Sequence, residues 1–307
     1  MNTSKPYWGH VGMLIANMLW GLMAPVSKDA LNYFHSNDIS AFTLAAFRMI
    51  GAAIAFWILD IFLPKESTTW SDRRKLFVAG MLSIVCNQCM FIIGVSFTTP
   101  IDASVVTTML PIVTMIIAAI VLREPITGLK VVGVLLGMSG AVLLILGGEY
   151  GLSLNKSCLI GDMMCLVAQF SFATYLVFFK NFISRFSAVT LMKWMFLWAA
   201  IVIVPFALPS IVSINYSAMP PKVIAEVCYT VFVGTFFTYL LVPIGQKTLR
   251  PTVVSMYNYV QPVMSTIVSL VWGLTTFGLV KGIAVGLVFA GVYIVTQSKK
   301  RADIIGK

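Results

Sequence analysis

The sequence repeats itself at a distance of about 150 residues, and this duplication constrains the fold more than any other feature. Unusual residue types of the first copy recur in the second at one constant offset. The matched pairs are Gly94 and Gly245, Pro100 and Pro251, Ser104 and Ser255, Pro111 and Pro262, Lys130 and Lys281, and Gly140 and Gly291. Earlier in each copy the offset is one residue longer, so that Asn17 matches Gln169. We therefore expect two copies of one structural unit.

The composition places both units in a lipid bilayer. Of the 307 residues, 59% are hydrophobic and 10% are charged, and the mean hydropathy is +0.93. A soluble domain cannot bury so much apolar surface. The sequence predicts an all-α integral membrane protein with ten transmembrane helices, at residues 10–30, 42–62, 76–97, 102–122, 129–147, 159–179, 189–208, 223–245, 252–273 and 281–297.

Five spans fall within residues 10–147 and five within residues 158–297. Because five is odd, the second unit must enter the membrane from the opposite side. The predicted fold is therefore a pair of inverted five-helix repeats. Inverted repeats are typical of transporters that work by alternating access, with a binding site near the bilayer midplane.

The distribution of the net charge of +10 predicts the orientation. If the N-terminus is cytoplasmic, the inner segments hold Lys5, Lys65, Arg73, Arg74, Lys75, Arg123, Lys130, Lys180, Arg185, Lys247, Arg250, Lys299, Lys300, Arg301 and Lys307, and the outer segments hold Lys28, Lys156, Lys222 and Lys281. This asymmetry predicts a multi-pass protein of the cell membrane with both termini in the cytoplasm. The basic residues are scattered over short loops and tails, so nucleic acid is excluded as a partner. The expected partners are the bilayer and a small-molecule substrate, and the sequence gives no sign of an obligate protein partner.

Metal, cofactor and catalytic sites are not expected. Cys86 and Cys89 have CxxC spacing, but they lie in a span without a neighbouring ligand, so small apolar packing is the preferred interpretation. An intramembrane enzyme would need a nucleophile with a base, or a metal cluster. The two histidines, His10 and His35, lie near span ends without a cysteine or carboxylate at ligand spacing.

Polar side chains inside spans mark the expected cavity, since they are costly in lipid unless they face protein or water. They gather in the first, third, fourth, sixth, eighth and ninth spans. The repeat pairs Asn17 with Gln169, Asn87 with Thr238, Gln88 with Tyr239, Ser104 with Ser255, and Thr107 with Asn258. Asn87 lies about eleven residues into its helix, near the midplane. The fifth and tenth spans are nearly all Val, Leu, Ile and Gly, which is typical of scaffold helices packed through small residues.

Two prolines at matched positions refine this site. A proline inside a helix leaves the carbonyl four residues earlier without a donor, so Pro111 frees that of Thr107 and Pro262 frees that of Asn258. We expect a helix kink at each proline. The freed carbonyls can present acceptors to a substrate; alternatively, Thr107 and Asn258 only satisfy the kinks, with water as a partner.

The predicted site combines these groups with aromatic rings. The predicted substrate-binding residues are Asn17, Trp20, Asn87, Gln88, Thr107, Gln169, Tyr175, Thr238, Tyr239, Asn258 and Gln261. Asn87 and Gln88 are expected to meet Asn258 and Gln261 across the repeat interface, with the freed carbonyls receiving an amino group of the substrate. A cavity of aromatic rings and uncharged amides suits a small organic molecule with an apolar part.

Ionisable residues within the spans are few. Arg48, near the outer end of the second span, can anchor a carboxylate of the substrate, pair with Asp29 or reach outward, and the structural roles are preferred. Glu124, close to Lys130, is expected to form a local ion pair. The sequence places no carboxylate at the midplane, so we expect facilitated or weakly coupled transport, with proton coupling as the alternative.

Several short segments resemble the EamA domain of the drug/metabolite transporter superfamily. They are Leu19-Trp-Gly, Phe47-Arg, Thr99-Pro-Ile-Asp-Ala-Ser, Leu110-Pro-Ile, Leu122-Arg-Glu-Pro-Ile-Thr and the glycines from Gly133 to Gly140. The resemblance covers nearly the whole chain as two units. It implies ten spans in an inverted five-plus-five fold, a central cavity built from the six polar spans, and export of amino acids or other metabolites, as in many members. One departure is that Glu124 matches Thr275 in the second copy, which puts strict functional symmetry in doubt.

We therefore expect a carrier for small organic metabolites, foremost an exporter of amino acids or related compounds. The alternatives within carriers are multidrug efflux and nucleotide-sugar exchange. Organic cations usually require a buried acid, and nucleotide phosphates require several buried basic residues. Neither is apparent in the sequence, which favours neutral or zwitterionic substrates. A membrane protein that handles lipids without transporting solutes is the alternative from another class.

Overall fold

The computed structural model describes residues 6–26, 28–37, 39–97, 103, 106–146, 156–271 and 278–298. All regular elements in these ranges are helices, and none is a strand. Six helices of the described chain are long and apolar enough to cross a membrane: Phe42–Ile61, Trp70–Gly94, Leu159–Phe178, Ala188–Ser213, Pro221–Thr248 and Leu279–Gln297. The prediction of an all-helical membrane protein is therefore confirmed, whereas the count of ten crossings and the inversion of the second half stay predictions.

Helical segments lie at each predicted position. The first half contains α1 (Pro6–Val26), α3 (Ala41–Ile61), the continuous run α4 (Trp70–Gly80), η1 (Met81–Cys86) and α5 (Asn87–Phe97), then α7 (Leu110–Val121) and α8 (Gly128–Leu146). The second half contains α9 (Lys156–Phe178), α11 (Ala188–Ser213), the run α12 (Pro221–Cys228), η3 (Tyr229–Phe237) and α13 (Thr238–Thr248), the run α14 (Pro251–Met256), η4 (Tyr257–Tyr259) and α15 (Val260–Val271), and α16 (Leu279–Gln297). Three short helices, α2 (Lys28–Ser36), α10 (Lys180–Ile183) and η2 (Tyr216–Ala218), lie in connections.

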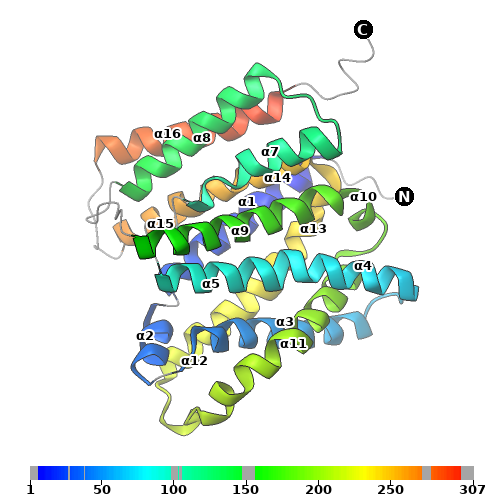
Figure 1. The fold of residues 1–307 in the computed structure, drawn as a ribbon, viewed down its shortest axis with the longest axis vertical. Coiled ribbons are helices and arrows are strands. Elements are labelled where there is room, and N and C mark those ends of the chain that lie inside the picture. The colour runs from blue at the N-terminus through cyan, green and yellow to red at the C-terminus, as the bar shows by residue number, and fades with distance from the viewer. Residues whose placement is uncertain are drawn as a thin grey trace.

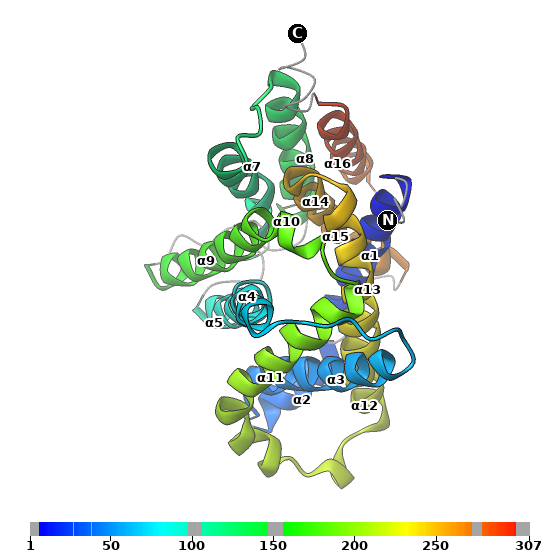
Figure 2. The same ribbon diagram turned by 90° about the vertical axis from the view of Figure 1, so that its right-hand side faces the viewer.

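Helices of each half pack on helices of the other half, and the contacts follow the repeat. Helix α5 packs on α9 as α13 packs on α1, and α7 packs on α9 as α15 packs on α1. The remaining pairs join matching helices: α8 lies beside α16 at one end of the molecule, and α3 lies beside α11 at the other (Figures 1 and 2). The four helices α1, α5, α9 and α13 lie between these two end pairs, so the centre of the molecule is built from both halves.

The predicted end of the first span, at residue 30, is wrong. Helix α1 stops at Val26, and residues 28–30 belong to the separate helix α2, which packs on α12. Pro25 contributes to this stop because it has no N–H to donate to the carbonyl of Gly21. The hydroxyl of Ser265 in α15 donates to that carbonyl instead, at 3.1 Å.

The outer surface carries large apolar side chains, as expected of a protein surrounded by lipid. Phe206, Val271 and Leu279 are 74%, 78% and 81% exposed. Soluble monomers rarely expose broad apolar surface of this kind. Behind it, Phe56 of α3 stacks on Phe196 of α11 with ring centroids 5.6 Å apart, and both rings are fully buried.

Small residues bring α8 and α16 into close contact, which confirms the packing predicted for the fifth and tenth spans. A Cβ placed on Gly291 would lie 2.5 Å from the backbone nitrogen of Gly137 and 2.6 Å from the carbonyl oxygen of Gly133. A Cβ on Gly140 would lie 2.5 Å from the carbonyl oxygen of Ala284. Side chains at these positions would force the two backbones apart.

We predict that Gly291→Val lowers the thermal unfolding midpoint of the purified protein, because overpacking at a backbone contact costs at least about 1–3 kcal/mol. Gly286→Val is the matched control on the same helix, since nothing lies within 4 Å of a Cβ at that position. Unfolding of both variants in one detergent, followed by intrinsic fluorescence, makes the comparison. Equal midpoints for the two variants would contradict the close contact.

The two ends of the described chain lie on the same side of the helices (Figure 1). A Cβ on Gly9, near the start of α1, would meet Thr248 at the end of α13. Arg250, two residues later, donates to Ser298 just after α16, and Lys180 of α10 donates to the carbonyl of Leu249. Basic residues therefore gather on the side where both ends lie.

We predict that this side is the cytoplasm, by the excess of Lys and Arg. A reporter fused at Lys307 should indicate the cytoplasm, and one inserted after Gly151, between the halves, should indicate the outside; both positions lie beyond the described residues. Paired reporters, one active inside the cell and one outside, make the measurement. A C-terminus outside the cell would overturn the predicted topology.

Candidate functional site

Two π-helical segments lie at repeat-related positions in the middle of the molecule. They are η1 in the first half and η3 in the second, and η1 coincides with the last part of η3 when the halves are aligned. Asn87 and Gln88 directly follow η1, and Thr238 and Tyr239 directly follow η3. The predicted polar pairs thus begin α5 and α13. Because π-helical turns shift the hydrogen-bond pattern, they are frequent at functional sites.

Side chains from the opposite half bond to carbonyls of both π-helical segments. The hydroxyl of Ser171 in α9 donates to Leu82 of η1 at 2.7 Å. The indole of Trp20 in α1 donates to Gly234 of η3 at 3.0 Å. The first helix of each half therefore stabilises the irregular backbone of the other half. Trp20, predicted to bind substrate, uses its one N–H donor for this contact.

The two matched prolines lie just after helix interruptions. Helix α7 begins at Leu110, so Pro111 is in its first turn, and α15 begins at Val260 after the 3₁₀ turn η4, so Pro262 is its third residue. These interruptions take the place of the kinks expected at the prolines. A proline in the first turn of a helix costs little, because the N–H it lacks would be unsatisfied there anyway.

A satisfied amide network joins α1 to the interrupted ninth span. The side-chain nitrogen of Gln261 donates to the carbonyl oxygens of Asn17 at 2.9 Å and of Asn258 at 2.5 Å. Asn17 donates in turn to the backbone of Met13 at 2.8 Å. Asn258 donates to the backbone carbonyl of Thr107 at 3.5 Å. The carbonyl that was expected to be freed by Pro111 therefore has a partner within the protein.

A second cluster joins α1, α3, α5 and α13. The ring of Tyr239 packs edge-on against Trp20 at 5.6 Å and against Phe196 at 4.9 Å. The amide of Gln88 lies beside the Tyr239 hydroxyl. Gln88 is 8% exposed, and neither of its amide atoms reaches hydrogen-bond geometry with a described residue, the nearby Tyr239 hydroxyl included. A buried amide without partners costs about 1–3 kcal/mol, so this side chain is a candidate for binding a ligand.

Arg48 of α3 completes this second cluster. Its Nε donates to the hydroxyl of Thr235 in η3 at 2.8 Å, and the guanidinium lies in electrostatic range of Tyr239. The side chain of Asp29, its possible partner, lies outside the described residues.

The remaining predicted site residues have structural contacts or lie apart. Asn87 donates to the carbonyl of Ala168 at 2.9 Å, next to the buried Gln169. The hydroxyl of Tyr175 donates to Gln246 at 3.0 Å, and its ring is fully buried between other rings. Thr238 donates to the carbonyl of Val233 at 2.7 Å.

The predicted meeting of the third and ninth spans does not occur through hydrogen bonds. Within the part of the chain that the structure describes, none joins Asn87 or Gln88 to Asn258 or Gln261. Those predicted residues that do come together form two clusters instead of one. One is the amide network, and the other contains Arg48, Gln88 and Tyr239.

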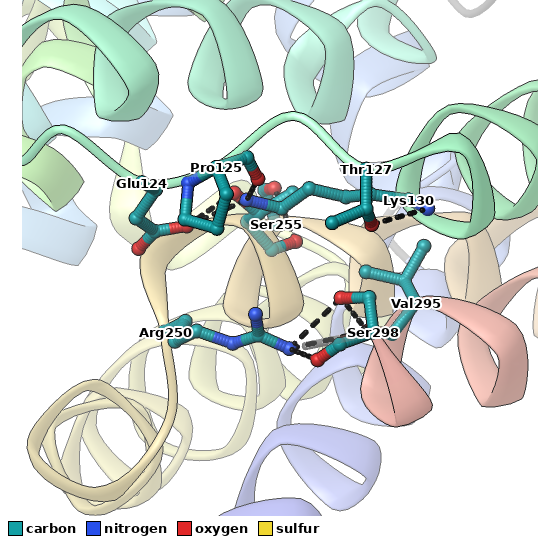
Figure 3. A network of polar contacts seen from close by, with 9 residues as sticks. Glu124, Pro125, Thr127, Lys130, Arg250, Ser255, Val295 and Ser298 are labelled. Carbon is teal, nitrogen blue, oxygen red and sulfur yellow. Dashed lines mark hydrogen bonds and ion pairs between the residues drawn. The ribbon is translucent and has the colours of Figure 1, made fainter. Parts of the chain in front are cut away.

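The expected ion pair of Glu124 is confirmed, and Figure 3 shows it beside Arg250 and Ser298. The Lys130 ammonium lies 2.7 Å from the Glu124 carboxylate, and its side chain is fully buried. Thr252 at the start of α14 donates to the same carboxylate at 3.3 Å. This network fastens the segment between α7 and α8 to the second half. The matched position Thr275 lies outside the described residues.

Sequence reasoning missed the π-helical segments and assigned Arg48 to a structural role. The π-helical turns leave no regular trace in hydropathy, although threonines that donate to carbonyls five residues earlier, such as Thr235 to Thr230 at 2.7 Å, accompany them. The sequence could show that Arg48 lies in a span, but it could not show which groups surround the guanidinium.

Comparison with known proteins now identifies the family. The sequence model of the EamA-like transporter family matches residues 7–146 and 159–297. The chain belongs to the EamA-like transporter family. The resemblance seen in the sequence is thus confirmed, and the chain is a multi-pass membrane transporter.

Individual relatives agree with this assignment. An uncharacterized transporter of Archaeoglobus fulgidus is 26% identical, over 91% of this chain and 95% of that protein. The uncharacterized transporter YyaM of Bacillus subtilis is 23% identical, over 92% of each. A solved crystal structure matches with a TM-score of 0.78, over 94% of this chain and 96% of that chain, at 18% identity, which shows the fold alone.

We expect replacement of glutamine by leucine to have opposite effects on stability in the two clusters. Gln88→Leu removes an amide that has no partner among the described residues, so the unfolding midpoint should stay equal or rise. Gln261→Leu leaves the oxygens of Asn17 and Asn258 without their donor and should cost about 1–3 kcal/mol. Thermal unfolding of both variants in one detergent tests this. A larger loss for Gln88→Leu than for Gln261→Leu would refute the distinction between the clusters.

Proposed function

We propose that this transporter is a carrier for small organic metabolites, foremost amino acids or related compounds, which it exports by alternating access. It would lie in the cell membrane with both termini in the cytoplasm. The substrate would bind between the halves, against the residues predicted from the sequence. Of these, Gln88, Tyr239 and Asn258 would contact it directly.

The observation that carries this proposal is the buried Gln88 amide, which has no hydrogen-bond partner in the described part of the chain and lies just after a π-helical segment. An amide offers both a donor and an acceptor, and the adjacent tyrosine hydroxyl offers the same. The rings of Trp20, Tyr239 and Phe196 add apolar surface. Together these groups suit a small solute that has polar and apolar parts.

The surrounding charges favour a neutral or zwitterionic solute over an organic cation. Described carboxylates near the span ends already have partners: Asp60 lies 2.7 Å from Lys193, Glu124 lies 2.7 Å from Lys130, and Glu226 accepts from the backbone of Ala30 at 2.7 Å. An organic cation would need a buried acid for its charge. Multidrug efflux is therefore the weaker alternative.

Nucleotide-sugar exchange is also weaker, because phosphates call for several basic residues and the second cluster holds one, Arg48, among its described side chains. A lipid-handling role without solute transport would leave the Gln88 amide, which has no partner in the described chain, without a purpose. The family is one of transporters, which favours a carrier over an enzyme.

We predict that cells overproducing the protein accumulate its substrate outside, as shown by a metabolite screen of the medium. In proteoliposomes the same solute should show saturable flux. Gln88→Ala and Asn258→Ala should weaken the apparent affinity roughly three- to hundred-fold, because each removes a hydrogen bond to the solute, while Val285→Ala on α16 should change it far less.

Wild-type affinity in the Gln88 and Asn258 variants, at equal abundance, would show that the polar residues serve only the helices. Absence of solute flux in both assays would favour the lipid-handling alternative. Collapsing the proton gradient across the vesicles separates the coupling modes: facilitated transport should persist, and loss of accumulation would establish proton coupling.

A further inference from the structure

We propose that Arg48 binds a carboxylate group of the substrate, so that the carrier selects solutes that carry one. This inference deepens the proposed function and rests on it. It assigns to the site a cation that the sequence alone placed among structural residues, and it names the chemical group that every good substrate must have.

The position of Arg48 fits a substrate contact. It is seven residues from the start of α3, or about 10 Å along the helix axis, which is within the membrane-spanning part. Helix α3 packs against η3, and the guanidinium Nε donates to Thr235 there. That hydroxyl donates onward to Thr230 at 2.7 Å, so the contact fixes the direction of the guanidinium.

The charge of Arg48 is not neutralised by the described part of the chain. Its hydrogen bond to Thr235 uses one of five N–H donors, and no described carboxylate forms an ion pair with it. Arg48 is half-buried, whereas the buried cations Lys193 and Lys130 pair with Asp60 and Glu124. An uncompensated cation within a membrane is costly, and cations so placed mark substrate or ion sites.

The neighbours of Arg48 suit a bound carboxylate. A guanidinium presents its terminal nitrogens as a planar fork that matches the two oxygens of a carboxylate. The hydroxyl of Tyr239 lies in electrostatic range of the guanidinium, and the amide of Gln88 lies beside that hydroxyl. The cluster that would hold the carboxylate therefore also contains a hydroxyl and an amide, each of which can donate a hydrogen bond. The rings of Trp20 and Phe196, packed on Tyr239, would contact the apolar part of the solute.

The charge count favours a carboxylate over a phosphate. A carboxylate carries one negative charge, which a single arginine neutralises. A phosphate ester carries close to two and would need another cation. Lysines near the ends of the helices are engaged elsewhere: Lys180 donates to the carbonyl of Gln246 at 2.7 Å, and Lys247 donates to that of Phe186.

Binding of matched compounds to the purified protein tests the inference. The probes are 4-methylpentanoate and 4-methylpentanamide, which differ only in the carboxylate, and leucine and leucinamide, which add an amino group. Dissociation constants come from the rise of the unfolding midpoint with probe concentration. The wild-type protein should bind each acid at least about ten-fold more tightly than its amide, as expected for a charged hydrogen bond.

Arg48→Gln should weaken binding of the acids roughly ten- to hundred-fold and leave binding of the amides unchanged. It should also keep or raise the unfolding midpoint without probe, because it removes a charge that no described carboxylate pairs with. Arg74→Gln is the matched control, since Arg74 is exposed at the start of α4 and should leave both preferences intact. If Arg48→Gln does not fold, Arg48→Lys replaces it: the planar fork is lost, and affinity for the acids should fall about ten-fold.

Three results would overturn the inference: no acid binds the wild type, acids and amides bind equally, or the substituted protein keeps its preference for acids. A lower unfolding midpoint with an unchanged preference would show that Arg48 only fastens α3 to η3. The metabolite screen separates this failure from failure of the proposed function. Export of a solute without a carboxylate refutes the role of Arg48 and keeps the carrier, whereas absence of any flux refutes the carrier itself.

Discussion

The structure depends on one constraint: inside a bilayer, a backbone carbonyl without a helical donor has no water to bond to. Helices of this chain are interrupted at several depths, and side chains from elsewhere donate to carbonyls near four of the interruptions. Trp20 donates to Gly234, Ser171 to Leu82, and Ser265 to Gly21. Tyr259 donates to Thr108 at 3.1 Å. All four bonds join the two halves, so each half stabilises the irregular backbone of the other.

This constraint separates polar residues that serve the fold from those left for a ligand. A polar side chain in a span has two possible uses, and composition cannot distinguish them. Asn17, Gln261 and Tyr175 have partners inside the protein, and their removal leaves other groups unsatisfied. Gln88 has no such partner in the described chain, and Arg48 has no carboxylate partner there. The groups whose bonding capacity exceeds what the described chain supplies lie together beside Tyr239. For this reason the second cluster, rather than the larger amide network, is proposed to hold the carboxylate of the substrate.

The class of fold and the family could be predicted from the sequence because both depend on patterns that extend over many residues. Hydropathy marks each helix, the repeat marks the two units, and glycines mark the contact of α8 with α16. Local geometry was less accessible. At the end of α1 and before Pro111, a backbone carbonyl lacks its helical donor. A hydroxyl or amide far away in the sequence donates to it instead, and no local sequence pattern encodes which one. The surroundings of Arg48 likewise depend on the packing of α3 against η3, which joins segments far apart in the chain.

The halves match in scaffold more closely than in chemistry, and this difference bears on alternating access. In an inverted repeat the two facing states arise when the halves exchange conformations. The π-helical turns, the interruptions before Pro111 and Pro262, and the packed pairs occur in both halves, as the proposed alternating access would require. The site is not symmetric: α3 contributes Arg48, whereas α11, its partner at the same end, contains no arginine. In the proposed mechanism, the site would open to either side while a carboxylate bound to Arg48 stays on α3. The solute would then keep one orientation relative to the protein throughout transport, and selectivity would be the same in both facing states.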